Sequence, residues 1–172
     1  MLRSLKLALL TLLLSLTLVG GSEALQITKV GKELVRGFQY AAPAQAKGYL
    51  AGYTVLAKLG RVQKRVLNIL PISTVAILYF APDGTLLGWS DKSDIVERGT
   101  WQVKTAPNGN DLCIFFDKGR GAGMCTVLIF GGPQFLESTK GNPFGLKANA
   151  AVPYDLGRFG VSLGNVAKKL GL

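Results

Sequence analysis

Few side chains in this sequence could carry chemistry, because it contains no histidine and only two cysteines. Histidine is the usual general base of serine and cysteine hydrolases, and a common protein ligand of zinc, copper and non-haem iron. The sequence therefore excludes catalytic triads and dyads that need histidine, together with histidine-ligated metal sites. We expect no catalytic residue of these types, no metal and no cofactor.

Acidic side chains are the remaining candidates for catalysis, since two carboxylates can hydrolyse a glycoside. Asp83 stands beside Gly84 in an expected turn, where an Asp side chain usually accepts a hydrogen bond from its own backbone. Asp91, Asp94 and Glu97 are spaced by three residues and could together bind a cation such as calcium. That stretch lacks the ligand density and central glycine of a calcium loop. A structural interpretation of these acids is favoured.

Cys113 and Cys125 are spaced for a disulfide across a β-hairpin. If the two cysteines face each other in antiparallel strands, Phe115 falls opposite Gly123 and residues 116–122 form the loop. An even number of cysteines usually pairs in an oxidising compartment, so we expect one disulfide. Two reduced, buried thiols are the competing interpretation.

The N-terminal segment has the three parts of a secretory signal peptide: a basic start, an apolar run over residues 7–19, and small residues before Ala24. We expect cleavage after Ala24. The apolar run is 13 residues long, whereas a membrane-spanning helix needs about 20; a retained anchor is the competing interpretation. No cysteine directly follows the run, so we expect residues 25–172 to be released into the periplasm or secreted, without a lipid anchor.

Positive charge dominates the expected mature protein, which keeps 18 of the 20 basic residues and 9 of the 10 acidic residues, a net charge of +9. The excess is concentrated in residues 25–70, where Glu33 is the only acid. Because unpaired cations are costly to bury, this charge belongs on the surface and favours anionic partners. We expect anionic lipid or polysaccharide, and peripheral membrane contact, ahead of nucleic acid.

Residues 25–70 are expected to be a basic helical segment, with a helix from Tyr49 to Leu70 whose apolar residues recur mostly at steps of three and four. Glycines weaken this helix, so a strand beginning near Val62 is the competing interpretation. The helix cations either lie on anionic headgroups or form a solvated face. These candidates for binding an anionic surface are Lys58, Arg61, Lys64 and Arg65.

The following residues predict β-structure, because short runs rich in β-formers alternate with turns. The expected strands are residues 75–80, 85–89, 99–104, 112–116 and 124–130. Residues 157–172 predict a short basic helix. The fold class is mainly β (α+β): an antiparallel meander forming a partly or fully closed small barrel, with an N-terminal basic helix and a short C-terminal helix, in one domain over residues 25–172.

Aromatic residues on these strands are first of all core candidates. The sharper interpretation is a cup inside a curled sheet, where a small barrel can hold one apolar ligand. The candidates for lining such a cavity are Tyr79, Trp89, Trp101 and Phe115.

Three strings also carry a resemblance to known proteins: Tyr79-Phe-Ala-Pro-Asp-Gly84, Gly99-Thr-Trp-Gln-Val103, and Leu112-Cys113 followed by Cys125. Together they resemble small exported proteobacterial β-rich proteins of unassigned function, which look like calycins or lipocalins. The resemblance covers about residues 75–130. It implies a β-fold and an exported compartment, and it implies no catalytic residue.

These observations favour a non-enzymatic periplasmic or envelope protein that binds an apolar or amphipathic ligand and associates with anionic envelope surfaces. Two alternatives are open. One is a hydrolase of envelope polymers that uses two carboxylates. The other is a disulfide-stabilised protein inhibitor, which would insert the loop from Lys118 to Gly123 into an acidic target.

Overall fold

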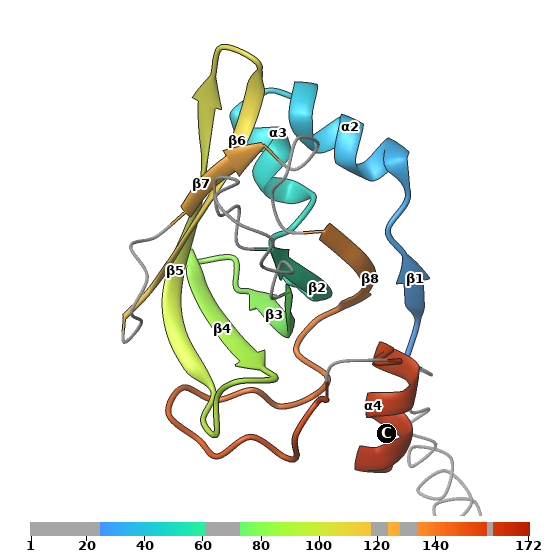
Figure 1. Ribbon diagram of the computed structural model, residues 1–172. Helices are drawn as coiled ribbons and strands as arrows, with labels where there is room; N and C mark the ends of the chain where they lie inside the picture. The colour runs from blue at the N-terminus through green and yellow to red at the C-terminus, as the bar shows by residue number, and fades with distance from the viewer. Residues whose placement is uncertain (1–24, 61–72, 118–123, 128–133, 158–159) are drawn as a thin grey trace, which may run out of the picture.

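The computed structural model describes residues 25–60, 73–117, 124–127, 134–157 and 160–172, and its body is one antiparallel sheet of eight strands (Figure 1). The strands are β1 (Ile27–Lys29), β2 (Tyr53–Gly60), β3 (Ser73–Phe80), β4 (Thr85–Ser90), β5 (Glu97–Ala106), β6 (Gly109–Phe116), β7 (Met124–Val127) and β8 (Gln134–Lys140). The helices are α2 (Lys32–Tyr40), α3 (Pro43–Gly48) and α4 (Leu163–Leu170).

The strands follow the order β1-β8-β2-β3-β4-β5-β6-β7, so β2 to β7 form the expected antiparallel meander. β8 then pairs with β2 on one side and β1 on the other. Among the described residues β1 and β7 are the two edges and do not pair with each other. The sheet is therefore not closed into a barrel.

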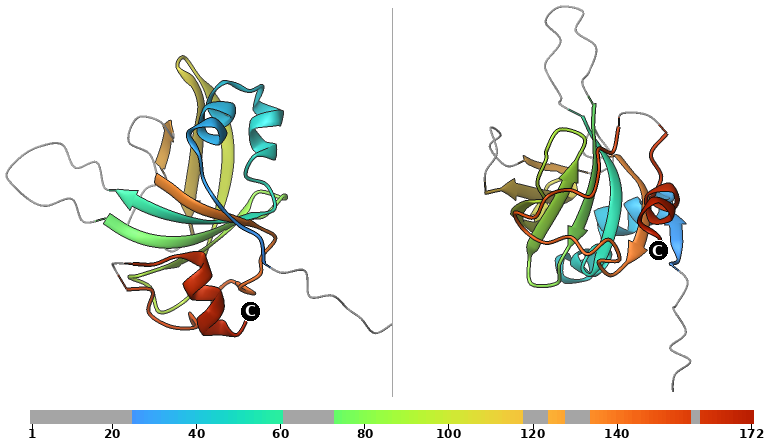
Figure 2. Two further views of the ribbon diagram at one scale, coloured as in Figure 1. Left: turned by 90° about the vertical axis from the view of Figure 1, so that its right-hand side faces the viewer. Right: turned by 90° about the horizontal axis from the view of Figure 1, so that it is seen from below.

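The sheet is the middle layer of the molecule and is covered on both faces (Figure 2). α2 and α3 cover one face, which we call the helix-pair face, and α4 with residues 144–157 and 160–161 covers the other, the C-terminal face. Along β3, Ala76 and Leu78 belong to the helix-pair core, whereas Val75 and Ile77 belong to the C-terminal core. Because successive side chains point to opposite faces, burial on both sides explains why this strand is a continuous apolar run.

β2 corrects the expected helix from Tyr49 to Leu70, which is wrong over residues 53–60. This strand lies between β3 and β8, with Val55 buried in the helix-pair core and Leu56 in the C-terminal core. A doubly buried strand has no polar face, so its apolar run can mimic a helical period. The helices of the basic N-terminal segment are α2 and α3 instead. Residues 61–72, with the alternative strand start near Val62, lie outside the described residues.

The C-terminal helix is confirmed as α4, which is shorter than the expected range of 157–172. Ser162 caps its N-terminus, where the Oγ accepts a hydrogen bond from the Asn165 amide at 3.1 Å. Gly171 ends it in the left-handed conformation, with φ of 71°. Within the described part of the chain, no helix combines the length and apolar character needed to span a membrane.

α2 is fixed to the turn between β5 and β6 by two buried amide side chains. The Asn110 Nδ2 donates to the carbonyls of Phe38 and Ala41, both at 2.8 Å, near the end of α2. In return, the Gln39 Nε2 donates to the Asn108 carbonyl at 2.6 Å. The start of this hairpin, between the strands expected at residues 99–104 and 112–116, therefore holds α2 against the sheet.

Replacing Asn110 by Ala is expected to lower the free energy of unfolding by about 2 kcal/mol, because two α2 carbonyls lose their donor in a buried site. Urea unfolding followed by tryptophan fluorescence measures this loss. Asn108→Ala is the matched control, since only the backbone carbonyl of Asn108 is used, and its effect should stay within about 0.5 kcal/mol. Equal effects of the two substitutions would contradict this account.

The predicted disulfide is present: Cys113 of β6 and Cys125 of β7 are direct partners in the register and are bonded. Cys113 is fully buried and Cys125 is exposed. The bond therefore ties the edge strand β7 to the body of the sheet. The predicted pairing of Phe115 with Gly123 involves a residue outside the described part.

The double substitution Cys113→Ala and Cys125→Ala should lower the free energy of unfolding by about 3 kcal/mol, because a loop of roughly a dozen residues is no longer closed in the unfolded chain. Urea unfolding with and without reductant tests this. The reductant should destabilise the natural chain by a similar amount and leave the double variant unchanged.

Candidate functional site

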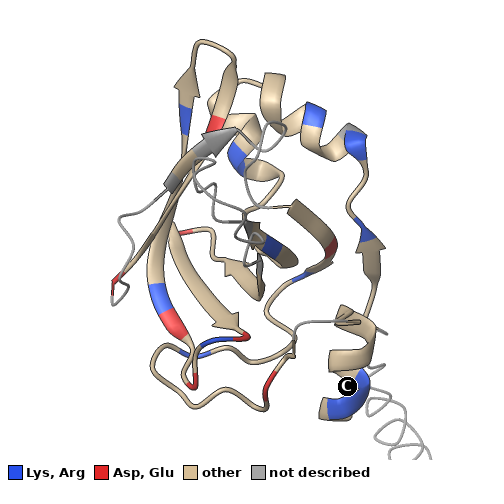
Figure 3. Ribbon diagram, in the orientation of Figure 1, with Lys and Arg blue, Asp and Glu red and all other residues tan. Residues whose placement is uncertain are grey.

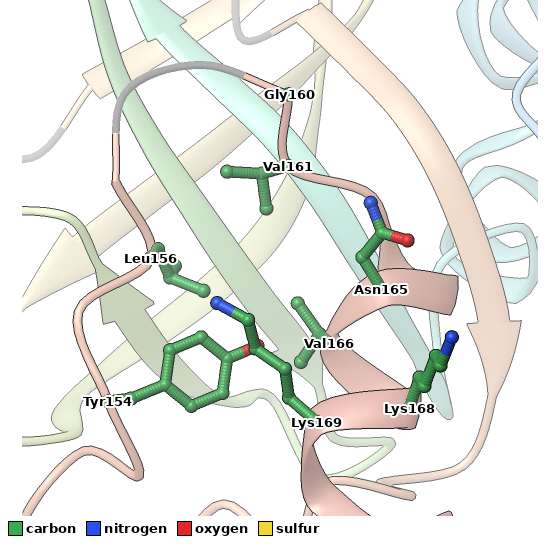
Figure 4. A pocket seen from close by; sticks show the side chains of 8 residues that line it. All are labelled: Tyr154, Leu156, Gly160, Val161, Asn165, Val166, Lys168 and Lys169. Atoms are coloured by element: carbon green, nitrogen blue, oxygen red, sulfur yellow. The ribbon is translucent and has the colours of Figure 1, made fainter.

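A pocket of about 260 Å³ lies between α4 and the segment that precedes it in the chain (Figure 4). The pocket is lined by eight residues, four from α4 and four from the segment before it: Tyr154, Leu156, Gly160 and Val161. Both groups rest on the C-terminal face of the sheet. The site is therefore formed by residues near the C-terminus and is supported by strands from the middle of the chain.

The floor of the pocket is apolar. Leu156 and Val166 are buried and belong to the C-terminal core, and the half-buried Val161 packs against that core. Val166 comes from α4, whereas the other two come from the preceding segment. These side chains can cover an apolar group but cannot bind it by hydrogen bonds.

The rim of the pocket carries a cation held over an aromatic ring. The Lys169 Nζ lies 4.6 Å from the centroid of the Tyr154 ring, within the range of a cation–π interaction. Figure 4 shows Lys169 extending over Tyr154, whereas Lys168 extends away from it. Asn165, on the same helix, adds an exposed amide. The rim thus offers N–H donors and positive charge, which suit an anion.

The sheet fixes the position of Tyr154 from below. The Trp89 indole N–H donates to the Tyr154 carbonyl at 3.2 Å, and the two rings pack edge to face with centroids 5.1 Å apart. Burial raises the pKa of the Tyr154 phenol above its ordinary value of 10.0, so the hydroxyl is neutral at physiological pH. Tyr154 is therefore a rigid, uncharged wall of the pocket.

A carboxylate from the sheet holds the first turn of α4. The Leu163 amide donates to the Glu137 Oε2 at 2.6 Å, from β8 to the start of the helix. A negative charge at a helix N-terminus also interacts favourably with the helix dipole. Glu137 thus positions the helix that supplies Lys169 and Val166 to the pocket.

The four aromatic residues expected to line one cavity do not lie together. Trp89 is fully buried in the C-terminal core and Tyr79 packs against that core. Trp101 lies on the opposite, helix-pair face, where its ring packs edge to face on Phe80 with centroids 5.3 Å apart. Phe115 is half-buried on β6. Of these residues, Trp89 contacts the pocket lining directly, as the support of Tyr154.

Of the four cations expected to bind an anionic surface, one lies in the described part of the chain. Lys58 is exposed on β2 and is therefore on a strand, where a helix was expected. Arg61, Lys64 and Arg65 lie outside the described residues.

Asp83 and Asp155 accept hydrogen bonds from nearby backbone amides, which gives these acids a structural role. The Asp83 Oδ1 accepts from the Thr85 amide at 2.8 Å, which confirms the expected turn. The Thr85 amide and hydroxyl hold the pKa of the Asp83 carboxyl below its ordinary value. The Asp155 Oδ1 accepts from the Gly157 amide at 2.9 Å. In the described ranges of the chain, no three acidic or cysteine side chains are grouped to hold a metal ion.

No pattern in the sequence marks the pocket, although the spacing of apolar residues predicts the helix that forms one side of it. The apolar steps of α4 and the cations at its end were visible in the sequence. The contact between Lys169 and Tyr154 was not, because the aromatic ring comes from an irregular segment that no periodicity marks.

Comparison with known proteins adds no relative: no protein-family model matches the chain, and neither a curated protein nor a solved structure matches it. The resemblance to calycins and lipocalins therefore stays a prediction.

Glu137→Ala should loosen α4, because the helix loses a charged hydrogen-bond acceptor worth about 2 kcal/mol. Hydrogen exchange read residue by residue should show faster exchange for the α4 amides and unchanged exchange for β3 and β4. Glu137→Gln keeps an acceptor oxygen without the charge and should give an intermediate rate. Unchanged exchange in α4 after Glu137→Ala would show that this contact does not hold the helix.

Proposed function

We propose that this chain is a non-enzymatic, exported binding protein that holds an anionic amphipathic ligand in the pocket beside α4. The observation that carries the proposal is the combination of an apolar floor, formed by Leu156, Val161 and Val166, with the Lys169 ammonium at the rim. A ligand with a carboxylate or phosphate head and a short apolar tail matches both parts.

The two parts of the pocket contribute differently to affinity. Burial of a ligand tail gives roughly 0.8 kcal/mol for each CH₂ group removed from water. An ion pair at an exposed rim gives only about 0–1 kcal/mol, because water screens it. The floor would therefore supply most of the binding free energy, and Lys169 would select the sign of the head group.

The size of the pocket limits the ligand. At about 260 Å³ it is a little smaller than the roughly 300–1,000 Å³ typical of sites for drug-sized molecules. A short acyl carboxylate, or the end of a longer acyl chain, fits this volume better than a sterol or a cofactor.

The disulfide supports an oxidising compartment for this function. Such bonds persist in the periplasm and outside the cell, whereas cytosolic thiols are kept reduced. The bond between Cys113 and Cys125 is compatible with export, and the expected signal peptide lies outside the described residues.

The alternative functions have less support. For a carboxylate hydrolase, three of the available acids have structural roles: Asp83, Glu137 and Asp155 each accept a hydrogen bond from a backbone amide. For a protein inhibitor, the loop from Lys118 to Gly123 lies outside the described residues. Neither alternative uses the pocket.

Binding of octanoate, measured by isothermal titration calorimetry, tests the proposal, with octanol as the neutral probe of equal chain length. The natural chain should bind octanoate more tightly than octanol. Lys169→Met should weaken octanoate binding by up to about fivefold, the equivalent of an exposed ion pair, and should leave octanol binding unchanged. Lys168→Met is the matched control, because that side chain extends away from Tyr154 in Figure 4.

A second variant tests the floor. Val161→Ser places a hydroxyl in the apolar floor of the pocket and should weaken the binding of both probes. If the natural chain binds neither probe, or binds both equally with no effect of Lys169→Met, the proposed function is wrong.

A further inference from the structure

Five exposed cations lie on three elements that meet along one side of the molecule. Two elements contribute pairs and one contributes a single residue: Lys29 of β1, Lys32 and Arg36 of α2, and Lys168 and Lys169 of α4. We call this set the basic edge. In Figure 3 these elements line the right-hand side, and the left view of Figure 2 faces that side.

β1 joins the two helices into this one surface. α2 follows β1 after two residues, and the Val30 amide donates to the Leu136 carbonyl of β8 at 2.9 Å, which fixes the connection to the sheet. At the other end of β1, α4 lies close to Ile27: a Cβ at Gly164 would be 3.8 Å from the Ile27 Cδ1. The cations are therefore held on a connected, supported surface.

Acidic residues are sparse along this edge. Glu33 is the one acid in the sequences of β1, α2 and α4. On the neighbouring β8, Glu137 accepts the hydrogen bond that holds α4. Most other described acids lie on β4, β5, β6 and their loops, away from this side in Figure 3: Asp83, Asp91, Asp94, Glu97, Asp111 and Asp117. Most described acids are thus separated from the basic edge, so its positive charge is little compensated.

An exposed aromatic side chain completes the surface. Lys32, Arg36 and Tyr40 follow one another at steps of four along α2, so they form one stripe on the helix. Tyr40 ends the stripe and is 72 % exposed, the most exposed large apolar side chain among the described residues. Tyrosine is enriched where protein meets the headgroup region of a bilayer, since its ring is apolar and its hydroxyl is polar.

We propose that the basic edge binds the surface of an anionic lipid bilayer. Its charge complements the headgroups, and Tyr40 suits the boundary between headgroups and acyl chains. A soluble acidic polymer would match the charge but would leave the exposed ring without a partner. The basic edge shares Lys168 and Lys169 with the pocket, but its other cations lie on β1 and α2, outside the pocket lining, so the proposal does not depend on a ligand in the pocket. If both proposals hold, α4 brings the pocket to a surface that supplies amphipathic anions.

Flotation with lipid vesicles tests this inference, using the protein recovered after expression of the full chain, with its N-terminus identified by mass spectrometry. Vesicles of phosphatidylcholine with and without phosphatidylglycerol give the preference for anionic lipid. The natural chain should prefer the anionic vesicles, and added salt should weaken that preference. Equal binding to both kinds of vesicle would overturn the proposal.

Matched charge variants locate the surface. Lys29→Gln, Lys32→Gln and Arg36→Gln together should weaken partitioning to anionic vesicles about 100-fold, since each cation near such a surface is worth about fivefold. The control removes three exposed lysines from other elements: Lys92→Gln, Lys104→Gln and Lys147→Gln. Their combined effect should be a few-fold only. Equal losses in the two triple variants would show that net charge, and not this edge, drives binding.

Two further measurements separate this inference from its competitors. Tyr40→Ser should weaken vesicle binding but not binding to dextran sulfate; a preference for dextran sulfate with no effect of Tyr40→Ser would point to an acidic polymer and overturn the proposal. Val161→Ser, which should impair octanoate binding, should leave vesicle partitioning intact. Failure of the pocket and failure of the basic edge can therefore be told apart.

Discussion

Burial of β2 and β3 on both faces is the constraint on which the other elements depend. Side chains of each strand enter both cores, so each face needs a cover. Fully burying one Val, Leu or Ile gives about 1.5–3 kcal/mol, and these strands contribute several such side chains to each face. α2 and α3 supply one cover, and α4 with the segment before it supplies the other. The candidate pocket exists because the second cover is made of two separate pieces.

In each cover, polar contacts from the sheet fix one end of a helix. Asn110 holds the end of α2 through two carbonyls, and Glu137 holds the beginning of α4 through one amide. Both side chains come from strands and satisfy backbone groups that a helix end leaves without partners. The apolar cores give the helices their affinity for the sheet, while these contacts set where each helix begins or ends. Asn110 thereby positions α2 with Lys32 and Arg36, and Glu137 positions α4 with Lys168 and Lys169.

Short-range patterns in the sequence predicted those elements that depend on neighbouring residues. The turn at Asp83 and Gly84, the short runs rich in β-formers and the spacing of the two cysteines predicted the hairpins and the disulfide. β2 was predicted as a helix, because a strand covered on both faces lacks the alternation that marks a half-exposed one. The pocket could not be predicted, since Tyr154 owes its place to Trp89, which is 65 residues away in the chain.

The disulfide at Cys125 also bears on how the protein avoids strand pairing with another copy of itself. Among the described residues β7 is the last strand of the sheet. If β7 detached, the backbone donors and acceptors of β6 would be open to pairing with another chain, which is how sheet edges promote aggregation. Because β7 is bonded to the fully buried Cys113, it stays next to β6 and covers these groups. The disulfide thus limits exposure of the β6 edge, in addition to closing a loop in the unfolded chain.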